Sequence, residues 1–237
     1  MSDAALAYAG TELELFAGAR NWKAYWAGQI APFIRGRVLE AGAGIGTNTA
    51  LLHNSNVTFW LALEPDASQA AAIQEKRDRG ELPAHCTVLA DTAQALRGDD
   101  RFDTILYIDV LEHIADDRGE MARAARHLAP GGHLIVLSPA HQFLFSPFDA
   151  AIGHERRYDR SMLAAVTPCG CRTVAMRMLD SAGFFLSLGN RLVSRAALPT
   201  RGQIDLWDRV FVPVSRWLDR RTGFRFGKSI LAVWRAA

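Results

Sequence analysis

Residues 38–46 read Val38-Leu39-Glu40-Ala41-Gly42-Ala43-Gly44-Ile45-Gly46, a short apolar run that leads into glycines at every second position. The run from Val38 to Ala41 predicts a buried strand, and residues 46–53 predict a helix. A strand that turns into a helix through glycines lets backbone amides approach a ligand at the edge of an open sheet. The spacing G-x-G-x-G departs from the dinucleotide fingerprint G-x-G-x-x-G, so this stretch alone does not identify the ligand.

On the C-terminal side of this stretch, short apolar runs alternate with helical patterns, which is typical of β-α-β units and a parallel sheet. Strands are expected at residues 57–63, 87–90, 102–108 and 133–138. Helices are expected at 66–79, with Asp66 as the cap, and at 117–128. Pro130-Gly131-Gly132 predicts a turn before the fifth strand. The pattern predicts an α/β fold built on a Rossmann-like, doubly wound sheet.

Regular alternation ends at Pro139, and the remaining elements are spaced differently. We expect a helix at 159–166, a strand at 172–180, helices at 184–198 and 204–221, and a last strand at 228–235. The roughly 45 residues between the last two strands are too many for a plain hairpin connection. The prediction is a seven-stranded, mostly parallel sheet with an antiparallel last strand and a helical cap inserted at about 182–222.

These elements suggest one domain over residues 1–237. Within it, 1–36 would form N-terminal helices or a lid, 37–139 a cofactor-binding half, and 140–237 a substrate-side half. No window reaches about 18 uninterrupted apolar residues and no basic segment precedes an apolar run, so we expect a cytoplasmic protein without a membrane span.

Charge is distributed unevenly along the chain. Residues 1–150 hold 12 basic and 19 acidic side chains, and residues 151–237 hold 15 and 6, so the net charges are −7 and +9. The basic part could meet an anionic substrate, a phospholipid surface or nucleic acid, or could be balanced by the acidic part within one fold.

Three carboxylates narrow the choice of ligand. Glu40 precedes the first glycine by two residues, where it would repel a pyrophosphate but suit a cationic ligand. Glu64 ends the second strand, where a carboxylate can accept hydrogen bonds from both ribose hydroxyls. Asp91 follows the third strand and offers an acceptor to an adenine amino group, although it could instead cap a helix. The set favours a cationic adenosyl ligand.

From about residue 37 to 138 the chain resembles the class I S-adenosylmethionine-dependent methyltransferases. The similarity lies, in the family's order, in residues 38–46, Leu63-Glu64-Pro65, Ala90-Asp91-Thr92, 102–113 and 128–134. The resemblance implies S-adenosylmethionine as cofactor, with the glycines beside its methionine part, Glu40 near its amine and Glu64 on its ribose. The cofactor-binding residues that it implies are Glu40, Gly42, Ala43, Gly44, Glu64, Pro65, Asp91, Thr92, Asp109, Val110 and His113.

Two carboxylates and an imidazole end the fourth motif. Asp109, Glu112 and His113 form a D-x-x-E-H pattern that is similar to the metal site of the RNA 3′-end methyltransferases. Methyl transfer needs no metal, because the sulfonium already carries the leaving group. In metal-free members with this spacing the histidine packs over the cofactor, so we expect no metal.

Candidates for catalysis lie after the fifth strand. Methylation of a hydroxyl needs a base, and an imidazole has a suitable pKa near neutral pH. His141 and His154 are the candidate bases. Arg156, Arg157 and Tyr158 are candidate substrate-binding residues, because paired arginines can clamp a carboxylate or phosphate. Alternatively, one arginine bonds backbone carbonyls or Asp149, and His154 packs the loop.

Aromatic residues near the N-terminus complete the candidate set. Trp22 and Tyr25 lie on a predicted helix before the first strand, and helices there often close over the cofactor in this fold. They are candidates for lining the substrate pocket, although aromatics at helical spacing are more often core residues.

The resulting hypothesis is S-adenosylmethionine-dependent methyl transfer to a small-molecule acceptor. A hydroxyl is the favoured methylation site, and the acceptor could be an anionic molecule. An RNA or protein methyltransferase is the first alternative, but the N/D-P-P-Y/F motif of nucleobase amino-group methylation is missing after the fourth strand. A non-catalytic cofactor-binding protein, or a membrane-associated one, is the second, because the segment from Phe184 is apolar. We expect a monomer or homodimer, no nucleic-acid partner, and at most peripheral membrane contact.

Overall fold

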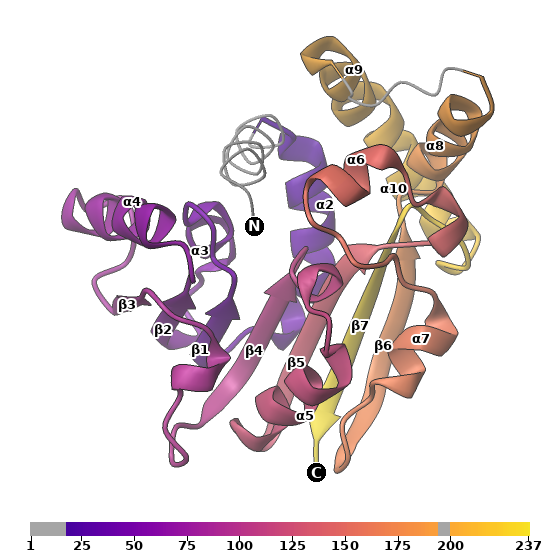
Figure 1. Ribbon diagram of the computed structural model, residues 1–237. Coiled ribbons are helices and arrows are strands. Elements are labelled where there is room, and N and C mark those ends of the chain that lie inside the picture. Colours follow the sequence, from indigo (N-terminus) through magenta and orange to yellow (C-terminus); the bar gives the residue numbers. More distant parts are fainter. Residues whose placement is uncertain (1–17, 194–199) are drawn as a thin grey trace.

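A seven-stranded mixed sheet forms the centre of the protein in a computed structural model, which describes residues 18–193 and 200–237 (Figure 1). In sequence order the strands are β1 (Gly36–Ala41), β2 (Val57–Leu63), β3 (Cys86–Leu89), β4 (Phe102–Ile108), β5 (Leu128–Pro139), β6 (Cys171–Leu179) and β7 (Ser229–Ala236). Their spatial order is β3-β2-β1-β4-β5-β7-β6. The first five strands pair in parallel, and β7 runs antiparallel to both neighbours. The predicted Rossmann-like fold is confirmed.

Helices cover both faces of the sheet, with α5 (Asp117–Arg126) and α7 (Arg160–Ala165) in front and α2 (Arg20–Ile30) behind in Figure 1. Successive side chains of a strand point to opposite faces. Accordingly, Leu39 joins the core that includes α5 and α7, and its neighbour Val38 joins the core that includes α2. The remaining elements of this half are η1 (Ala31–Phe33), α3 (Thr47–Leu52), α4 (Ala67–Asp78), η2 (Ala93–Ala95) and η3 (Leu111–His113).

The second half departs from the predicted boundaries in several places. The elements between β5 and β7 are η4 (Gln142–Leu144), α6 (Pro147–Ala151), α7, β6, α8 (Ser181–Val193), α9 (Arg201–Leu206), the π-helical turn η5 (Trp207–Phe211) and α10 (Val212–Arg221). The single helix predicted at 204–221 is thus interrupted. The turn predicted at 130–132 lies inside β5 as a bulge, because Leu128 pairs with Phe102 and His133 with Thr104. Residues 1–17 of the predicted lid and 194–198 of a predicted helix lie outside the described residues.

Strand direction determines where the inserted helices lie. Since β6 and β5 both run antiparallel to β7, β6 ends at the same edge of the sheet as β1, β4 and β5. Residues 180–228, which contain α8, α9, η5 and α10, therefore begin and end at the carboxyl edge. In parallel α/β sheets, ligands bind at this edge, next to the point where the strand order reverses. Here that point is between β1 and β4.

Buried carboxylates join the inserted helices to α2. Asp180, which is in the left-handed region at φ 67°, accepts hydrogen bonds from Trp207 Nε1 at 2.8 Å and Ser215 Oγ at 2.7 Å. Asp219 accepts from the Tyr25 hydroxyl at 2.7 Å and from the Asp180 amide at 2.8 Å. Because an unpaired buried carboxylate is costly, these bonds fix the relative positions of β6, α10 and α2.

The N-terminus of α2 is capped by a distant residue. Residues 20–22 begin the helix without a side-chain cap from Ala19. The buried Asp208 carboxylate instead accepts from the amides of Asn21 at 3.1 Å and Trp22 at 2.8 Å. The first amides of a helix lack intrahelical partners, so η5 supplies what the local sequence lacks.

We expect Asp208→Ala to lower the free energy of unfolding by about 1 to 2 kcal/mol, the usual cost of losing an N-terminal cap. Urea unfolding measures this change. Asp205→Ala provides the control, because Asp205 is an exposed acid one turn earlier and its loss should leave stability within about 0.5 kcal/mol of the wild type. Equal stability of both variants would mean that Asp208 does not cap α2.

Candidate functional site

The glycine-rich loop lies between β1 and α3 in a conformation that requires glycine. Gly42, Gly44 and Gly46 have φ values of 64°, 57° and 77°, in the left-handed region that residues with a Cβ avoid. A Cβ at Gly42 would lie 2.6 Å from Val110 Cγ2, which follows β4. The loop therefore packs directly against the end of β4.

Glu40 precedes this loop, and only one of its two carboxylate oxygens is hydrogen-bonded to the described residues. The side chain is fully buried, and Oε2 accepts from Thr49 Oγ1 at 2.5 Å and Trp60 Nε1 at 3.1 Å. Oε1 has no hydrogen-bond partner among the described residues. Burial raises the pKa of Glu40 to about 7, although the two donors oppose the rise. A buried acceptor without a donor fits the cationic amine of S-adenosylmethionine.

Glu64 links β2 to the same loop. Its Oε2 accepts from the Gly44 amide at 2.8 Å and its Oε1 from the Asp66 amide at 2.9 Å. Burial raises the pKa of Glu64, and the two backbone donors oppose this rise. The carboxylate that was predicted to bind ribose thus lies next to the glycine loop.

The remaining adenine-side candidates are exposed at the ends of β2 and β3. Pro65 and Asp91 are open to solvent, and the Asp91 carboxylate accepts from the Thr92 amide at 2.7 Å. Thr92 is exposed as well and caps η2 through its hydroxyl, which accepts from the Gln94 amide at 3.3 Å. Asp91 and Thr92 therefore remain available to a ligand at this rim.

Asp109 ends β4 in a strained conformation, with φ 54°. Its carboxylate is open to solvent, yet the surrounding protein limits its hydration and raises the pKa, and positive charge from His154, Lys228 and Lys23 opposes the rise. A non-glycine residue in the left-handed region often marks a functional position. Asp109 follows Ile108 at the reversal of the strand order, where the predicted cofactor site lies.

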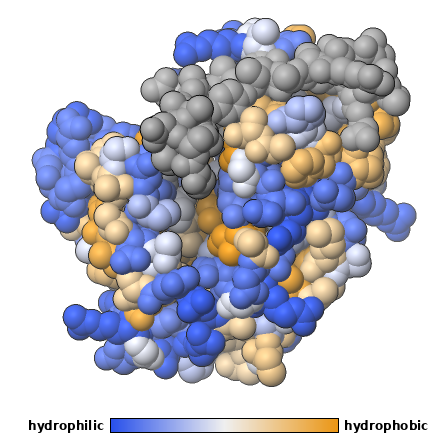
Figure 2. Space-filling view, in the orientation of Figure 1, coloured by the Kyte–Doolittle hydropathy of each residue, from blue (hydrophilic) through white to orange (hydrophobic). Residues whose placement is uncertain are grey.

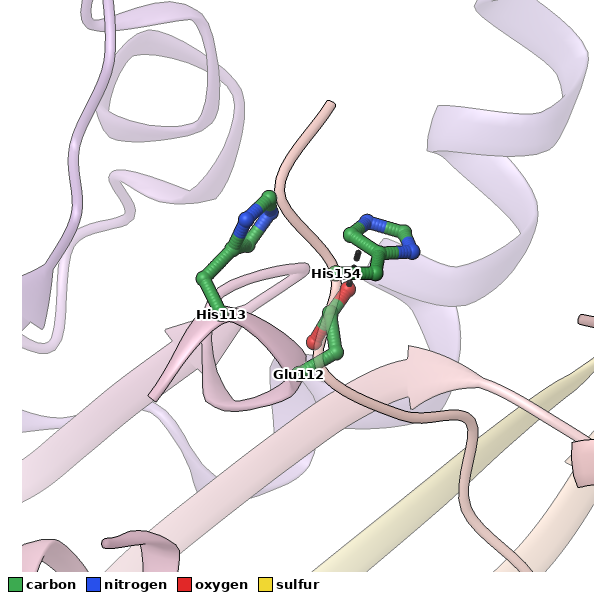
Figure 3. A group of neighbouring side chains, drawn as sticks. All are labelled: Glu112, His113 and His154. Carbon is green, nitrogen blue, oxygen red and sulfur yellow. Dashed lines mark ion pairs between the residues drawn. The ribbon is translucent and has the colours of Figure 1, made fainter. Parts of the chain in front are cut away.

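Glu112, His113 and His154 form a cluster next to Asp109 (Figure 3). His154 Nε2 lies 3.9 Å from Glu112 Oε1, and the two imidazole rings meet edge to face with centroids 4.6 Å apart. His113 is open to solvent, yet the surrounding protein limits its hydration and lowers its pKa to about 4, with His154 contributing. Ligand atoms of the three residues lie within 4.8 Å of one another, so the cluster could hold a metal ion. The absence of a metal stays a prediction.

His154 is oriented by a buried carboxylate. His154 Nδ1 lies 3.0 Å from Asp149 Oδ1, and Arg157 binds both oxygens of Asp149 at distances from 2.8 to 3.0 Å. Ser146 Oγ also donates to Asp149, at 2.7 Å. Although burial opposes ionisation, these donors hold the pKa of Asp149 well below its usual range. Asp149 is therefore an ionised group that fixes the position of the imidazole.

The other residues of the 153–158 loop hold it to the protein. Arg156 donates to the carbonyls of Ile114 at 3.0 Å and Ala115 at 2.9 Å and pairs with Asp117 at 2.9 Å. Tyr158 is buried, and its hydroxyl donates to Asp117 at 2.8 Å. The arrangement matches the alternative foreseen for Arg156 and Arg157, since both have partners within the chain.

His141 and the N-terminal aromatics lie among other partners. His141 has φ 68°, its Nε2 lies 3.0 Å from the Gly227 carbonyl, and its ring packs on Phe184. Trp22 packs on Trp207 with centroids 5.8 Å apart. Tyr25 is buried against Asp219, and burial raises its pKa. Both aromatics thus join α2 to the inserted helices, and a role for them in the pocket stays a prediction.

Lys228 belongs to the surroundings of the site but was not foreseen. It precedes β7 at the carboxyl edge, with its ammonium 5.1 Å above the Trp207 ring. Burial lowers its pKa, and the charges of Asp180, Asp149 and Asp109 oppose this effect. The predicted antiparallel direction of the last strand placed its first residue at this edge, so a signal for Lys228 was present in the sequence.

Comparison with known proteins decides the family. A family model described as a methyltransferase domain matches residues 17–175. The chain belongs to the class I methyltransferases. This family uses S-adenosylmethionine, so the predicted family and cofactor are confirmed. The matched region of the methyltransferase contains the glycine loop, Glu64, Asp91 and the Asp149–His154 pair.

Named relatives cover only parts of the methyltransferase. Ubiquinone biosynthesis O-methyltransferase of Rhodopseudomonas palustris is 28% identical over 102 residues, which are 42% of this chain and 38% of that protein. The chain spans less than two fifths of the length of the curated relatives it matches.

Solved structures share the fold at low sequence identity. One is a chain in the complex of the Haloferax volcanii Trm112 methyltransferase activator with a methyltransferase. Its TM-score is 0.64 at 16% identity, and the alignment covers 100% of this chain and 99% of that chain. Another is coclaurine N-methyltransferase bound to N-methylheliamine and SAH. Its TM-score is 0.59 at 14% identity, and the alignment covers 87% of this chain and 69% of that chain. These similarities support the fold of the methyltransferase.

We expect Gly42→Ala to weaken S-adenosylmethionine binding by about tenfold or more, because the added Cβ collides with Val110 and displaces the loop. Calorimetric titration measures the affinity. Gly80→Ala is the matched control, because Gly80 has a similar φ of 75° but open space around a Cβ. It should cost about 1 to 2 kcal/mol of stability and leave the affinity unchanged. Equal affinities of the two variants would rule out the collision.

Glu40→Gln should remove a pH dependence of stability. The pKa of Glu40 rises from 4.5 to about 7 in the folded protein, so the folded state binds this proton more tightly than the unfolded chain. Glu40 should contribute a loss of up to about 3 kcal/mol as pH rises from below 4.5 to above 7, and the variant should lack this contribution.

Urea unfolding without ligand at about pH 5 and about pH 8 tests this expectation. At the higher pH the variant should also bind S-adenosylmethionine more weakly, because its amide cannot pair with the amine as a carboxylate does. An identical loss of stability in both proteins would exclude Glu40 as its source.

Proposed function

We propose that this methyltransferase methylates a hydroxyl oxygen of a small, anionic acceptor, with His154 as the general base. The observation that carries the proposal is the bond between His154 and the buried, ionised Asp149, 3.0 Å long. A carboxylate that accepts from one imidazole nitrogen leaves the other nitrogen available to take a proton. The name of the Rhodopseudomonas palustris relative, an O-methyltransferase, supports oxygen as the nucleophile.

The residues divide the work in a simple way. Bound S-adenosylmethionine supplies a methyl group on a sulfonium, which is already activated for displacement. The glycine loop, Glu40 and Glu64 hold the cofactor in place, and Asp149 keeps Nδ1 of His154 protonated. Nε2 then accepts the proton of the acceptor hydroxyl as its oxygen attacks the methyl carbon. In-line placement of this oxygen supplies much of the rate enhancement.

Lys228 is a better candidate for binding the anionic group of the acceptor than Arg156 and Arg157 are. Arg156 and Arg157 are occupied by carbonyls, Asp117 and Asp149. Lys228 lies at the carboxyl edge, is half-buried, and is influenced by the charges of Asp149 and Asp109. Incomplete hydration strengthens its attraction for an anion. We assign Lys228 to the carboxylate or phosphate of the acceptor.

A macromolecular acceptor is the second candidate. The net charge of +9 in residues 151–237 favours an RNA, and a structural relative was solved with a methyltransferase activator. Transfer of labelled methyl groups from S-adenosylmethionine to cell extract, followed by separation by size, distinguishes the two. Label in a low-mass fraction supports the small acceptor, and label only in RNA or protein contradicts it.

His154→Ala should lower kcat by about 10²- to 10⁴-fold and leave the affinity for S-adenosylmethionine unchanged, because the base acts only on the acceptor. Single-turnover methylation of the labelled acceptor provides the rate. His141→Ala is the control, because His141 contacts Phe184 and the Gly227 carbonyl instead of Asp149. Full rate for His154→Ala at every pH would exclude His154 as the base.

A further inference from the structure

A row of large apolar side chains is exposed along the inserted helices. Leu206, Val210, Val214 and Trp217 follow one another at spacings of four, four and three residues, which places them on one face of the helical run from Arg201 to Arg221. Each is between 48% and 56% exposed. A soluble helix normally turns such a stripe towards a core, but the described residues leave this face exposed.

The neighbouring helix widens the stripe into a continuous surface. Phe185 and Leu186 of α8 are 56% and 39% exposed, and they line the same groove as Val210 and Val214. Figure 2 shows hydrophobic residues at its right edge, below the grey part, near where Figure 1 places α8 and α10. We call this surface the apolar face, and its residues are Phe185, Leu186, Leu206, Val210, Val214 and Trp217.

Most exposed charges in the segment that carries the greater part of the apolar face belong to arginines. Between residues 201 and 225 the exposed charged side chains are those of Arg201, Asp205, Arg209, Arg216, Arg220, Arg221 and Arg225. The other two acids of this segment, Asp208 and Asp219, are buried and bonded to α2. The exposed part is therefore strongly cationic, with six arginines against one aspartate.

We propose that the apolar face docks this protein onto the surface of an anionic phospholipid bilayer. An amphipathic helix with aromatic and aliphatic residues on one face and arginines beside them binds in the plane of a membrane interface. Apolar side chains enter the acyl boundary while arginines meet lipid phosphates. The guanidinium of Arg221 lies 4.2 Å above the Trp217 ring, which places an aromatic ring and a cation together at headgroup depth.

The charge pattern favours a bilayer over a second copy of the chain. A two-fold interface would bring the same surface of two protomers together, and with it two sets of six arginines. An anionic bilayer neutralises the arginines and covers the apolar residues in one contact. No helix in the described ranges is long and apolar enough to cross a membrane, so the contact involves the surface alone.

Flotation with lipid vesicles tests the proposal. The wild type should float with vesicles of phosphatidylcholine that contain phosphatidylglycerol, much less with pure phosphatidylcholine, and less again at high salt, which screens the arginines. Arg209→Gln with Arg220→Gln should weaken binding about 30-fold, since each basic residue near an anionic surface contributes about fivefold. Val214→Ser with Trp217→Ser should weaken it about tenfold or more, because less apolar area is buried.

Matched controls keep the test specific. Arg118→Gln with Arg126→Gln removes two exposed charges from α5, and Leu51→Ser with Val174→Ser removes two exposed apolar side chains from other elements. Both controls should float like the wild type. All variants should bind S-adenosylmethionine normally, which shows that they are folded and separates docking from methyl transfer.

Two results would overturn the proposal. One is a wild type that does not float with the anionic vesicles, or variants of the apolar face that float as well as the controls do. The other is a change from dimer to monomer in Val214→Ser with Trp217→Ser, measured by light scattering, while flotation stays unchanged. That result would assign the apolar face to contact between copies of the chain.

Discussion

The need to match buried carboxylates with donors governs the carboxyl edge of this methyltransferase. The buried acids at this edge are Glu40, Glu64, Glu112, Asp149, Asp180, Asp208 and Asp219. Each ionised oxygen that leaves water must gain hydrogen bonds, or the fold loses several kcal/mol, on the order of the whole stability of a domain. The donors come from elements far apart in sequence, so satisfying the acids assembles the site. For Glu40, the described chain provides donors for only one of the two oxygens.

This distribution separates scaffold from binding function. Asp180, Asp208 and Asp219 are satisfied by the chain and act as fixed joints between β6, the inserted helices and α2. Asp149 is also satisfied, but one of its donors is the imidazole of His154, whose second nitrogen lies 3.9 Å from Glu112 Oε1. Buried carboxylates therefore hold the scaffold together in one place, and under the proposed function one of them orients a base in another.

The local patterns were sufficient for the fold and the cofactor loop. Strand alternation, the cap at Asp66 and the glycine spacing each depend on neighbours in the sequence, and the structure agrees with them to within one or two residues except at the start of β5, which begins at Leu128 instead of residue 133. Arg156 pairs with Asp117, 39 positions away, and Tyr25 bonds to Asp219, 194 positions away. No local sequence pattern encodes pairings over such separations. The π-helical turn was missed for the same reason, because it turns Trp207 and Asp208 towards α2.

The cap on α2 has a consequence for how the chain acquires its structure during synthesis. The first amides of this helix gain their hydrogen-bond acceptor only when Asp208 is synthesised, 186 or 187 residues later. Until then, a helix that precedes the first strand has exposed amides and cannot dock Tyr25 on Asp219. The N-terminal helix therefore completes its folding only after most of the chain has emerged, in keeping with a domain that folds as one unit.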